Sequence, residues 1–572
     1  MVNQINQIIP VIFTNKAACR DCYRCVRACP VNAISVINGQ AQVIASRCIA
    51  CGTCVNECPQ GAKSYRSDLE KLDDMIKAQD RIAFSIAPSF AALYSPWEQK
   101  RLPSALRALG AVYVGETAIG AYESAQAIAE FVTKNPDKQH ICPACPAVVS
   151  LIEKYYPALV KTITPVVSPM VAHGRMLKKM LGAEVRVVFV GPCTAKKDEA
   201  SRMEHQSMID VVLTFDELQQ LFIDHKIDLR NCEESDFNAH PHGYARYFPV
   251  EGGLLKTAGI AVSCDSDQVV AVSGEKNVRQ ALETLLQTKK PMVVEPMFCN
   301  GGCVHGPVGL KNNSFLNRGA VIEYSRSNPG IEIEELTQDV SFHQQFNQKG
   351  SIKITEYTED QIMEVLTKTG KESTENQLNC GACGYNSCRD KAIAVLDGMA
   401  ELEMCIPYMR RLAEQKSDLI LETDPNGIVI LDDKLQIVAM NPAFRKMFFC
   451  TDAVLDKKIS YLIDPDPFEK LLLNPTEVVR KTVTYKSYNL MCHQMHYHIK
   501  ESNQLVGIFV DITDTFMTRE KLKEVKRDTL LQARELIDHQ VEMAQEIARY
   551  LGESSAQGEM LLKKLMSAID DK

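Results

Sequence analysis

Four cysteines stand in three short loops that are far apart in the sequence, between residues 140 and 310. The loops contain Cys145, Cys193, and the pair Cys299 and Cys303. Thiolates are preferred ligands of iron–sulfur centres, and loops carried by a rigid scaffold can converge on one centre. Glycines between the last two cysteines would let the backbone approach such a centre closely. We therefore expect these loops to form one metal site.

Two copies of another cysteine pattern lie within residues 11–64. Each copy has the spacing Cys-x2-Cys-x2-Cys-x3-Cys-Pro, typical of bacterial ferredoxins, in which the fourth cysteine of each copy binds the other cluster. The pattern predicts an electron relay, because a pair of zinc sites would need neither the third cysteine nor the trailing proline. One 4Fe-4S cluster is then bound by Cys19, Cys22, Cys25 and Cys58, and the second by Cys48, Cys51, Cys54 and Cys29.

A third group of cysteines follows in residues 373–410. Cys380, Cys383 and Cys388 lie in a glycine-rich stretch, and Cys405 comes after a helical stretch. Three ligands in one loop and a fourth beyond a helix can close a 4Fe-4S cluster. The pattern is similar to a small iron–sulfur domain of electron-transfer and corrinoid-linked proteins, with a zinc knuckle as the alternative.

Composition narrows the functional class. The chain has 572 residues, enough for several domains, with 45% hydrophobic residues and a formal net charge of −8. It has no Lys/Arg cluster typical of nucleic-acid binding and no run of about 18 apolar residues that would span a membrane. The start lacks the features of a signal peptide.

Cysteine spacing predicts a reducing cytoplasm. Of the 21 cysteines, 16 fall into metal-type patterns, whereas a disulfide framework is typical of small secreted chains. The others have no shared spacing and are interpreted as packing or surface residues: Cys142, Cys232, Cys264, Cys450 and Cys492.

Strand-like and helical runs alternate between about residues 75 and 310, which indicates an α/β architecture. The paired runs are Ile82–Ala87 and Pro103–Leu109, Val112–Val114 and Ala118–Phe131, and Glu184–Val190 and Lys196–His205. The following segment, 311–372, is expected to contain a short strand at Ala320–Tyr324 and receives no function.

The three cysteine loops resemble the active site of an iron-only (FeFe) hydrogenase. The second loop matches the family pattern PCxxKKxE and the third matches ExMxCxxGC, although the family's trailing glycine run is absent. The first loop keeps only its ligand position at Cys145 and the following proline. Ile86–Ser89 resembles, more weakly, the segment that passes over the two-iron unit.

The resemblance implies an H-cluster, which is a 4Fe-4S cube bridged to a two-iron unit with CO and cyanide ligands. Cys145, Cys193, Cys299 and Cys303 would hold the cube, and Cys303 would bridge to the two-iron unit. Lys196 would donate to a cyanide, Met297 would line the pocket, and Pro88 and Ser89 would pass over it. Hydrogen would bind at the open iron and split against the amine of the bridging dithiolate.

One departure from the family pattern affects proton transfer. Catalytic relatives have a proton-carrying cysteine before the first ligand, whereas this chain has Ala144. Glu123 and Glu130 on the helical run Ala118–Phe131 do not fall clearly on the family's relay positions, and we do not expect Cys142 to replace the thiol. Because general acid–base help typically contributes about 10²–10⁴-fold, we expect slow hydrogen turnover.

Residues 411–514 resemble a PAS domain. Ile420–Thr423, Ile428–Leu431 and Gln436–Met440 are predicted strands separated by turns, and the segment closes with Asp511-Ile512-Thr513. The histidines His493, His496 and His498 fall on a predicted strand, and surface or pocket-wall positions are preferred over haem or metal ligation.

The tail, 515–572, is predicted to be helical, with a seam for a coiled coil or a packed helix. Its apolar positions follow a 3-4 spacing at Leu530, Ala533, Ile537, Gln540, Ala544, Ile547 and Leu551. The seam favours a homodimer through the PAS domain and tail, and a helix packed back on its own domain is the alternative.

The predicted class is multidomain α/β and α+β: a two-cluster ferredoxin domain (1–70), an H-cluster domain (75–310), a connecting segment (311–372), a 4Fe-4S domain (373–410), a PAS domain (411–514) and a helical tail (515–572). The leading hypothesis is a cytoplasmic hydrogenase-like oxidoreductase that senses H2, with three 4Fe-4S clusters besides the H-cluster. Expected partners are H2, a redox protein such as ferredoxin, and a separate phosphatase or kinase. The alternatives are a working ferredoxin-linked hydrogenase whose PAS domain only tunes assembly, and a non-enzymatic iron–sulfur scaffold.

Overall fold

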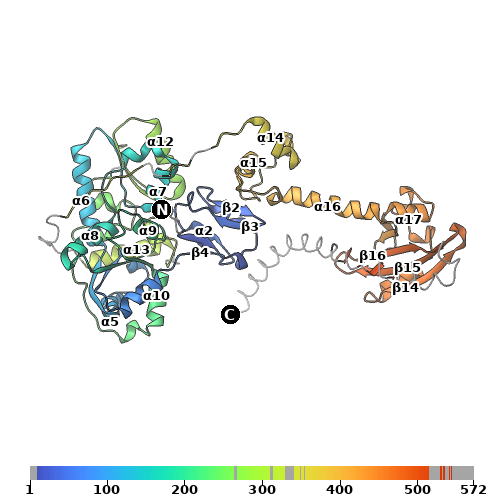
Figure 1. Cartoon of the computed structure of the whole chain (residues 1–572), viewed down its shortest axis with the longest axis horizontal. Coiled ribbons are helices and arrows are strands. Elements are labelled where there is room, and N and C mark those ends of the chain that lie inside the picture. The colour runs from blue at the N-terminus through green and yellow to red at the C-terminus, as the bar shows by residue number, and fades with distance from the viewer. Residues whose placement is uncertain are drawn as a thin grey trace, which may run out of the picture. The chain divides into compact units, whose positions relative to one another are not determined.

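The computed structural model describes residues 10–262, 267–309, 313–328, 340–347, 350–352, 355–513 and scattered positions between 529 and 543. The chain folds as two compact units, residues 1–405 and 406–572, whose elements are labelled in Figure 1. None of the described helices is long and apolar enough to cross a membrane.

The first unit begins with a small ferredoxin-like domain built from two antiparallel strand pairs and two short helices. Strands β1 and β4 pair with each other, as do β2 and β3, and each of the two helices contains the third cysteine of its run. Their bounds are β1 Ile12–Thr14, α1 Arg24–Ala28, β2 Ile34–Ile37, β3 Gln40–Val43, α2 Thr53–Glu57 and β4 Lys63–Tyr65.

A four-stranded parallel sheet forms the first half of the larger domain. Its order is β6-β5-β8-β9, with β5 at Ile82–Ile86, β6 at Ala111–Glu116, β8 at Arg186–Gly191 and β9 at Val211–Thr214. All residues of β5 are buried. Parallel strands covered on both faces have nearly continuous apolar sequences, which explains the strand-like runs found in the sequence.

A second parallel sheet has the order β10-β11-β7, with β7 at Gln139–Ile141, β10 at Val269–Ser273 and β11 at Met292–Met297. Cys193 follows β8, Cys145 follows β7, and Cys299 follows β11. The cysteine loops therefore leave the carboxyl ends of parallel strands in the two sheets, the positions at which open α/β folds usually place their ligands.

Helices surround these sheets (Figure 1). Their bounds are α3 Leu69–Lys77, α4 Pro96–Gln99, α5 Leu102–Ala108, α6 Ala118–Lys134, α7 Pro146–Tyr155, α8 Pro169–Leu181, α9 Ala195–Ala200, α10 Phe215–Asp224, α11 Gly253–Thr257, α12 Glu275–Gln287 and α13 Ser314–Ser327. Helices α6 and α8 pack closely because Gly120 has no side chain: a Cβ there would lie 2.4 Å from the backbone nitrogen of His173.

Two local predictions for this unit were wrong. The expected strand Ala320–Tyr324 lies within helix α13, where the buried residues Asn317, Val321 and Ser325 recur every fourth position along one face. The helix expected over Lys196–His205 ends at Ala200, and turns follow it.

The last part of the first unit carries the third cysteine group and packs on the ferredoxin-like domain. It contains α14 (Glu359–Lys368) and α15 (Cys388–Leu396). The Val36 N–H donates to the Met399 carbonyl at 2.9 Å, and Arg47 pairs with Asp397 at 3.4 Å. The two iron–sulfur regions are therefore neighbours in space although more than 300 residues apart.

The second unit, which includes the predicted PAS domain, has a five-stranded antiparallel sheet of order β13-β12-β16-β15-β14 with short helices. Its elements are α16 Ile406–Thr423, β12 Gly427–Leu431, β13 Ile437–Met440, α17 Pro442–Met447, α18 Asp466–Leu473, β14 Val479–Tyr485, β15 Leu490–Ile499 and β16 Gln504–Asp511. The predicted strand Ile420–Thr423 is wrong. These residues end helix α16, because a short apolar run without a breaker extends a helix already formed.

Most of the predicted helical tail, including Ala544, Ile547 and Leu551, lies outside the described residues. Among the described positions, Ala533 is buried, and Ile537 packs against the buried residues Ile428, Val506 and Ile508 of the sheet. At Ile537 the apolar seam thus contacts its own domain.

Candidate functional site

The ferredoxin-like domain brings together cysteines from both runs. Cys29 of the first run lines one small enclosed space with Cys48, Cys51 and Cys54 of the second. Cys25 in turn interacts electrostatically with Cys22, Cys19 and Cys58. The thiols are therefore grouped as the exchange of the fourth ligand between two clusters requires.

Backbone N–H groups point at the sulfurs of this domain. The N–H groups of Ala33, Ala50 and Ala62 donate to the sulfurs of Cys29, Cys48 and Cys58 at 3.2, 3.3 and 3.2 Å. Burial raises the pKa of Cys48 to about 11. The site thus favours thiolates only when cationic metal is bound, and the N–H donors then stabilise the charge on sulfur.

A cavity of about 90 Å³ lies where the cysteine loops leave the two parallel sheets. The side chains that line it include three of the four predicted cube ligands and every residue that the hydrogenase resemblance places near the two-iron unit. These are Cys145, Cys193 and Cys303 with Pro88, Ser89, Ala144, Lys196 and Met297. The thiol of Cys299 is partly buried and interacts electrostatically with the other three thiols.

The cysteines at the cavity are partly buried. Burial raises the pKa of Cys193 to about 11 and that of Cys303 still higher. Backbone N–H groups of Lys196 and Ala195 act in the opposite direction on Cys193. Three thiols at the wall of one cavity and a fourth close to them are a donor set for an iron–sulfur cube, whose charge would compensate the thiolates.

Lys196 lines the cavity, and its side-chain nitrogen has two hydrogen-bond partners. Its Nζ donates to Glu199 Oε2 at 2.7 Å and to Ser168 Oγ at 2.9 Å. Burial acts to raise the pKa of Glu199, but Lys196 and His205 hold it below its usual value. These two hydrogen bonds fix the position of the Lys196 nitrogen at the wall of the cavity.

Ser89 provides a separate test of whether the cavity fits a polar group. Its hydroxyl is fully buried at the cavity wall and has no hydrogen-bond partner among the described residues. An unpaired buried hydroxyl is costly, so it indicates a polar acceptor or donor that normally occupies this space. The residues present thus fit a two-iron unit with polar ligands.

Gly302, directly before the predicted ligand Cys303, stands at a position that only glycine fits. Its φ is +94°, and a Cβ there would lie 2.5 Å from the Pro249 carbonyl oxygen and 3.2 Å from the Met297 sulfur. No side chain can be placed at this position without moving the backbone beside the cavity.

Two titratable residues of the cavity wall received no role from the sequence. Glu295 accepts hydrogen bonds from the backbone N–H groups of Leu254 and Leu255 at 3.2 and 3.1 Å, and burial raises its pKa to about 7. Cys142 is 2% exposed and also lines the cavity. Burial raises its pKa well above the usual value, so it stays a neutral thiol. Glu123 and Glu130 are not among the lining residues.

The cavity lies next to the second group of ferredoxin thiols. Thr194, beside Cys193, donates through its hydroxyl to the Ala50 carbonyl at 2.7 Å. A Cβ on Gly52 would lie 2.7 Å from Pro307 and 2.9 Å from Thr194 Oγ1. The loop that carries Cys51 therefore packs directly on two of the cavity loops.

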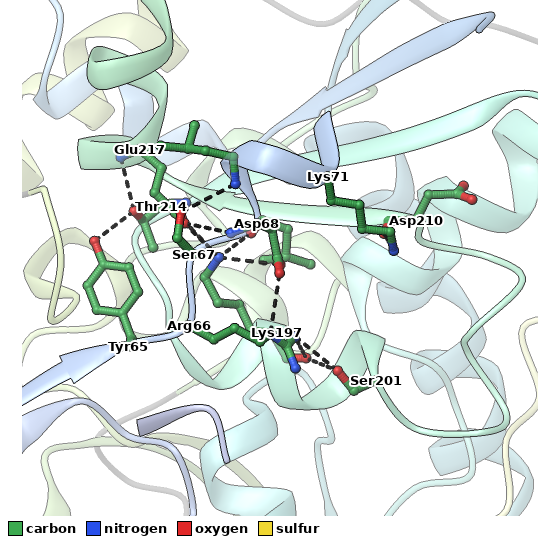
Figure 2. A network of polar contacts seen from close by, with 12 residues as sticks. Tyr65, Arg66, Ser67, Asp68, Lys71, Lys197, Ser201, Asp210, Thr214 and Glu217 are labelled. Atoms are coloured by element: carbon green, nitrogen blue, oxygen red, sulfur yellow. Dashed lines mark hydrogen bonds and ion pairs between the residues drawn. The ribbon is translucent and has the colours of Figure 1, made fainter. Parts of the chain in front are cut away.

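A buried network of polar groups fixes this junction (Figure 2). Lys197, fully buried on α9, pairs with Glu217 at 2.9 Å and with Asp68 at 3.4 Å. Arg66, which follows the last ferredoxin strand, donates to the Lys197 carbonyl at 3.3 Å and to Ser201 Oγ at 3.1 Å. Because α9 begins two residues after Cys193, the network couples the position of this ligand to the ferredoxin-like domain.

The third cysteine group packs on helix α1 of the ferredoxin-like domain. The thiol of Cys383 interacts electrostatically with Cys405 and Cys380. A Cβ on Gly384 would lie 3.0 Å from the Val26 side chain. Tyr385 is buried in the same apolar cluster as Cys25 and Val26. The tyrosine thus connects the third group with the ferredoxin thiols.

The zinc knuckle stays an alternative for the third cysteine group. In the PAS-type sheet, the His496 ring is fully buried, edge-on to Phe468 at 4.5 Å, and burial lowers its pKa to about 4. It is a neutral interior histidine. His498 donates to or accepts from Asn503 at 3.0 Å, and His493 contacts Thr482 at 3.1 Å.

Comparisons with known proteins agree with this geometry. Residues 80–307 match the family described as iron only hydrogenase large subunit, C-terminal domain, and residues 11–59 match a 4Fe-4S dicluster domain. Residues 376–407 match an Fe-S cluster family. Residues 80–307 therefore form a domain of the iron-only hydrogenase family. Together with the two iron–sulfur matches, this domain identifies the chain as an iron–sulfur protein.

Individual relatives are distant. Iron hydrogenase 1 of Clostridium pasteurianum is 25% identical over 364 residues, which cover 51% of this chain and 63% of the relative. The cytosolic Fe-S cluster assembly factor NAR1 of Yarrowia lipolytica is 27% identical over 228 residues, covering 34% of this chain and 46% of that protein. The chain thus spans less than two thirds of the length of either relative.

Solved structures include FeFe-hydrogenase HydA1 of Chlamydomonas reinhardtii, at 16% identity and a TM-score of 0.38, covering 49% of this chain and all of that one. The PAS domain of nitrogen regulation protein NR(II) of Vibrio parahaemolyticus is 22% identical with a TM-score of 0.15, covering 17% of this chain and 97% of that one.

Proposed function

We propose that this protein binds H2 at the cavity, activates it slowly, and passes the resulting redox state through its other clusters to the PAS-type domain. The observation that carries the proposal is the cavity itself. Three cysteine thiols lie at its wall together with Lys196, which is held by Glu199, and the Ser89 hydroxyl, which has no hydrogen-bond partner among the described residues. Neither polar group is needed for a plain electron-transfer cluster.

Four cysteines and one lysine of the cavity would bind the H-cluster. Cys145, Cys193, Cys299 and Cys303 would hold the 4Fe-4S cube, with Cys303 shared with the two-iron unit. A bound two-iron unit would supply the metal centre at which H2 is split heterolytically. Lys196 would donate a charge-assisted hydrogen bond to an anionic ligand such as cyanide, and its pairing with Glu199 keeps it in place.

Slow turnover follows from the groups at the cavity wall. Ala144 has no proton to carry, and Cys142 remains a neutral thiol because burial raises its pKa. The cavity wall is mostly apolar, with Ala87, Pro88, Phe189 and Met297 among its residues, which excludes water. A site that binds H2 but exchanges protons slowly is better suited to sensing than to metabolic flux.

Electrons have a continuous protein route away from the cavity. The second ferredoxin group packs on the cavity loops through Thr194 and Ala50, and the first group shares its core with the second. The third group contacts the same domain through Gly384 and Val26. We infer three accessory 4Fe-4S clusters, with the one at residues 380–405 nearest in sequence to the PAS-type domain.

The output of this route is proposed from the order of the domains. Cys405 is followed directly by helix α16, which leads to the PAS-type sheet. A change at that cluster would act on the second unit through this helix. A separate phosphatase or kinase, bound to a homodimer formed through the PAS-type domain and tail, would receive the signal in the cytoplasm, and ferredoxin would serve as a redox partner.

The experiment is anaerobic exposure of protein loaded with the two-iron unit to H2, with the accessory clusters followed by electron paramagnetic resonance. We expect H2 to reduce the accessory clusters in the loaded protein but not in protein lacking the two-iron unit. Loaded protein whose clusters stay oxidised under H2, while dithionite reduces them, would contradict the proposal.

A second candidate is an iron–sulfur scaffold without hydrogen chemistry. The relationship to a protein named as a cytosolic Fe-S cluster assembly factor favours it, because that relative matches over the same kind of domain. Under this alternative the loaded two-iron unit would not be retained. The unpartnered Ser89 and the positioned Lys196 favour the first proposal.

A third candidate, a fast ferredoxin-linked hydrogenase, predicts high native turnover. It lacks support at the cavity because Ala144 replaces the expected thiol.

A further inference from the structure

Two lysines are buried beside predicted cluster ligands and form no ion pair with a carboxylate among the described residues. Lys63 on β4 is 3% exposed, and Lys391 on α15 is 4% exposed. The Lys63 ammonium donates to Thr14 Oγ1 and to the Ala41 carbonyl at 3.1 Å. The Lys391 ammonium donates to the Leu402 carbonyl at 2.9 Å. A buried ammonium is costly unless negative charge compensates it.

Buried lysines near the cavity satisfy this requirement in the ordinary way. Lys196 pairs with Glu199, and Lys197 pairs with Glu217 and Asp68. The contrast shows that Lys63 and Lys391 need another source of negative charge.

The anionic groups that face Lys63 are cluster ligands from both ferredoxin groups. Its ammonium interacts electrostatically with the sulfur of Cys25 in the first group and with those of Cys29 and Cys54 in the second. The pairing of Lys63 with Thr14 across β1 and β4 holds its backbone in the core of the domain. The buried ammonium of Lys63 is therefore close enough to act on thiols of both groups.

Lys391 has the same relation to the third group. Its ammonium interacts electrostatically with Cys405 and Cys383, while the exposed Glu403 makes a smaller contribution. Lys371, which is 6% exposed, also interacts electrostatically with Lys391 and adds positive charge to this region.

We propose that Lys63 and Lys391 are internal counter-cations of the iron–sulfur clusters and raise the reduction potentials of those clusters. Lys63 acts on both ferredoxin clusters, and Lys391 acts on the cluster of residues 380–405. One-electron reduction adds negative charge to a cluster, and a fixed positive charge in a poorly screened interior stabilises the reduced form. The inference rests on cluster binding and not on hydrogen activation.

The test compares Lys63→Met with Lys63→Arg in the full chain prepared without the two-iron unit. Electron paramagnetic resonance follows reduction of the ferredoxin clusters by dithionite through redox mediators. Lys63→Met should shift both ferredoxin clusters to lower potentials, while Lys63→Arg keeps them near the unaltered protein. The exposed Lys16, three residues before Cys19, gives the control Lys16→Met, which should shift them far less because water screens its charge.

Lys391→Met provides an independent arm, in which only the cluster of residues 380–405 should shift. Unchanged potentials in a cluster-loaded Lys63→Met or Lys391→Met variant would overturn the assignment for that lysine. Loss of the clusters in Lys63→Met but not in Lys63→Arg would support the assignment, because arginine keeps the positive charge that methionine lacks. If both Lys63 variants lose their clusters, the proposal stands or falls with the reduction potential of the cluster of residues 380–405 in Lys391→Met. Because H2 is absent from this experiment, its outcome is independent of the proposed function.

Discussion

The ferredoxin-like domain and the cavity hold their cysteines in different ways. In the ferredoxin-like domain, two or three residues separate successive ligands of a run, and the fourth cysteine of each run belongs to the other group. Around the cavity, ligands come from loops after β7, β8 and β11, which belong to two separate sheets. The first arrangement is largely local, whereas the second exists only when the larger domain is folded.

The buried lysines of the two regions also have different partners. Lys63, near the ferredoxin groups, has no carboxylate partner among the described residues, whereas Lys196 at the cavity pairs with Glu199. A cluster in the first region would have its reduction potential raised by a buried cation whose charge no carboxylate offsets. In the second region the ammonium keeps a fixed position for a directed hydrogen bond. This contrast fits electron storage in one region and ligand recognition in the other.

The largest expected effect is the selective loss of clusters. Cys29→Ala should remove the cluster assigned to Cys48, Cys51 and Cys54, although Cys29 belongs to the other run. Cys145→Ala should remove the cavity cluster and leave both ferredoxin clusters in place. Iron content and electron paramagnetic resonance measure both results. Cys232 lies outside every cysteine group, so Cys232→Ala is the control and should change neither the iron content nor the resonance spectrum.

The contrast would fail if Cys29→Ala removed the cluster of Cys19, Cys22 and Cys25 instead, because the ligand exchange would then be wrong.

Restoring a thiol beside the cavity should give the next largest effect. Ala144→Cys places a proton carrier at the wall, and general acid–base help typically contributes about 10²–10⁴-fold. We expect H2 turnover of the loaded protein to rise toward this range, measured by dye-linked H2 oxidation. Ala144→Ser is the control for the change in size. High turnover of the unaltered protein that the cysteine does not increase would disprove the role given to Ala144.

Breaking the junction of the two regions should destabilise the first unit. Lys197→Met leaves the carboxylates of Glu217 and Asp68 buried without their cation, and removal of one partner of a buried pair costs about 3–5 kcal/mol. Thermal unfolding measures the loss. The exposed pair Lys134 and Glu130 is the matched control, and Lys134→Met should have little effect. Equal effects of the two variants would show that the network does not hold the junction.

The smallest effect is a pH dependence at the cavity. The pKa of Glu295 is raised to about 7 by burial, so the folded state binds a proton more tightly than the unfolded state. Its contribution is present below the ordinary pKa near 4.5 and is lost as the pH rises to about 7, which amounts to about 3 kcal/mol. Glu295→Gln should remove this part of the slope between pH 5 and 7, as measured by unfolding at each pH. An unchanged slope would show that Glu295 titrates normally.

Sequence reasoning worked best where the chemistry is local. The ferredoxin ligand sets follow from spacing alone, and the strands before the cysteine loops follow from apolar runs that are buried on both faces. It failed for short apolar runs such as Ala320–Tyr324 and Ile420–Thr423, which lie within helices. A run of four or five residues does not distinguish a strand from a helical face.

Features that depend on tertiary contacts were not predictable from the sequence. Nothing local marks Glu295 as a carboxyl group with a raised pKa, because burial at the end of β11 produces the shift. The same holds for Lys197, whose partners Asp68 and Glu217 lie in other segments, and for the packing of Gly384 on Val26. The resemblance gave a role to Lys196 but none to its neighbour.

The most direct test of the central claim is the infrared spectrum of protein loaded with the two-iron unit. If the cavity formed by Cys145, Cys193, Cys299 and Cys303 holds an H-cluster, bands of iron-bound CO and cyanide will persist after free complex is removed. Lys196→Met should shift the cyanide bands. A spectrum without such bands, from protein whose ferredoxin clusters are intact, would contradict the account.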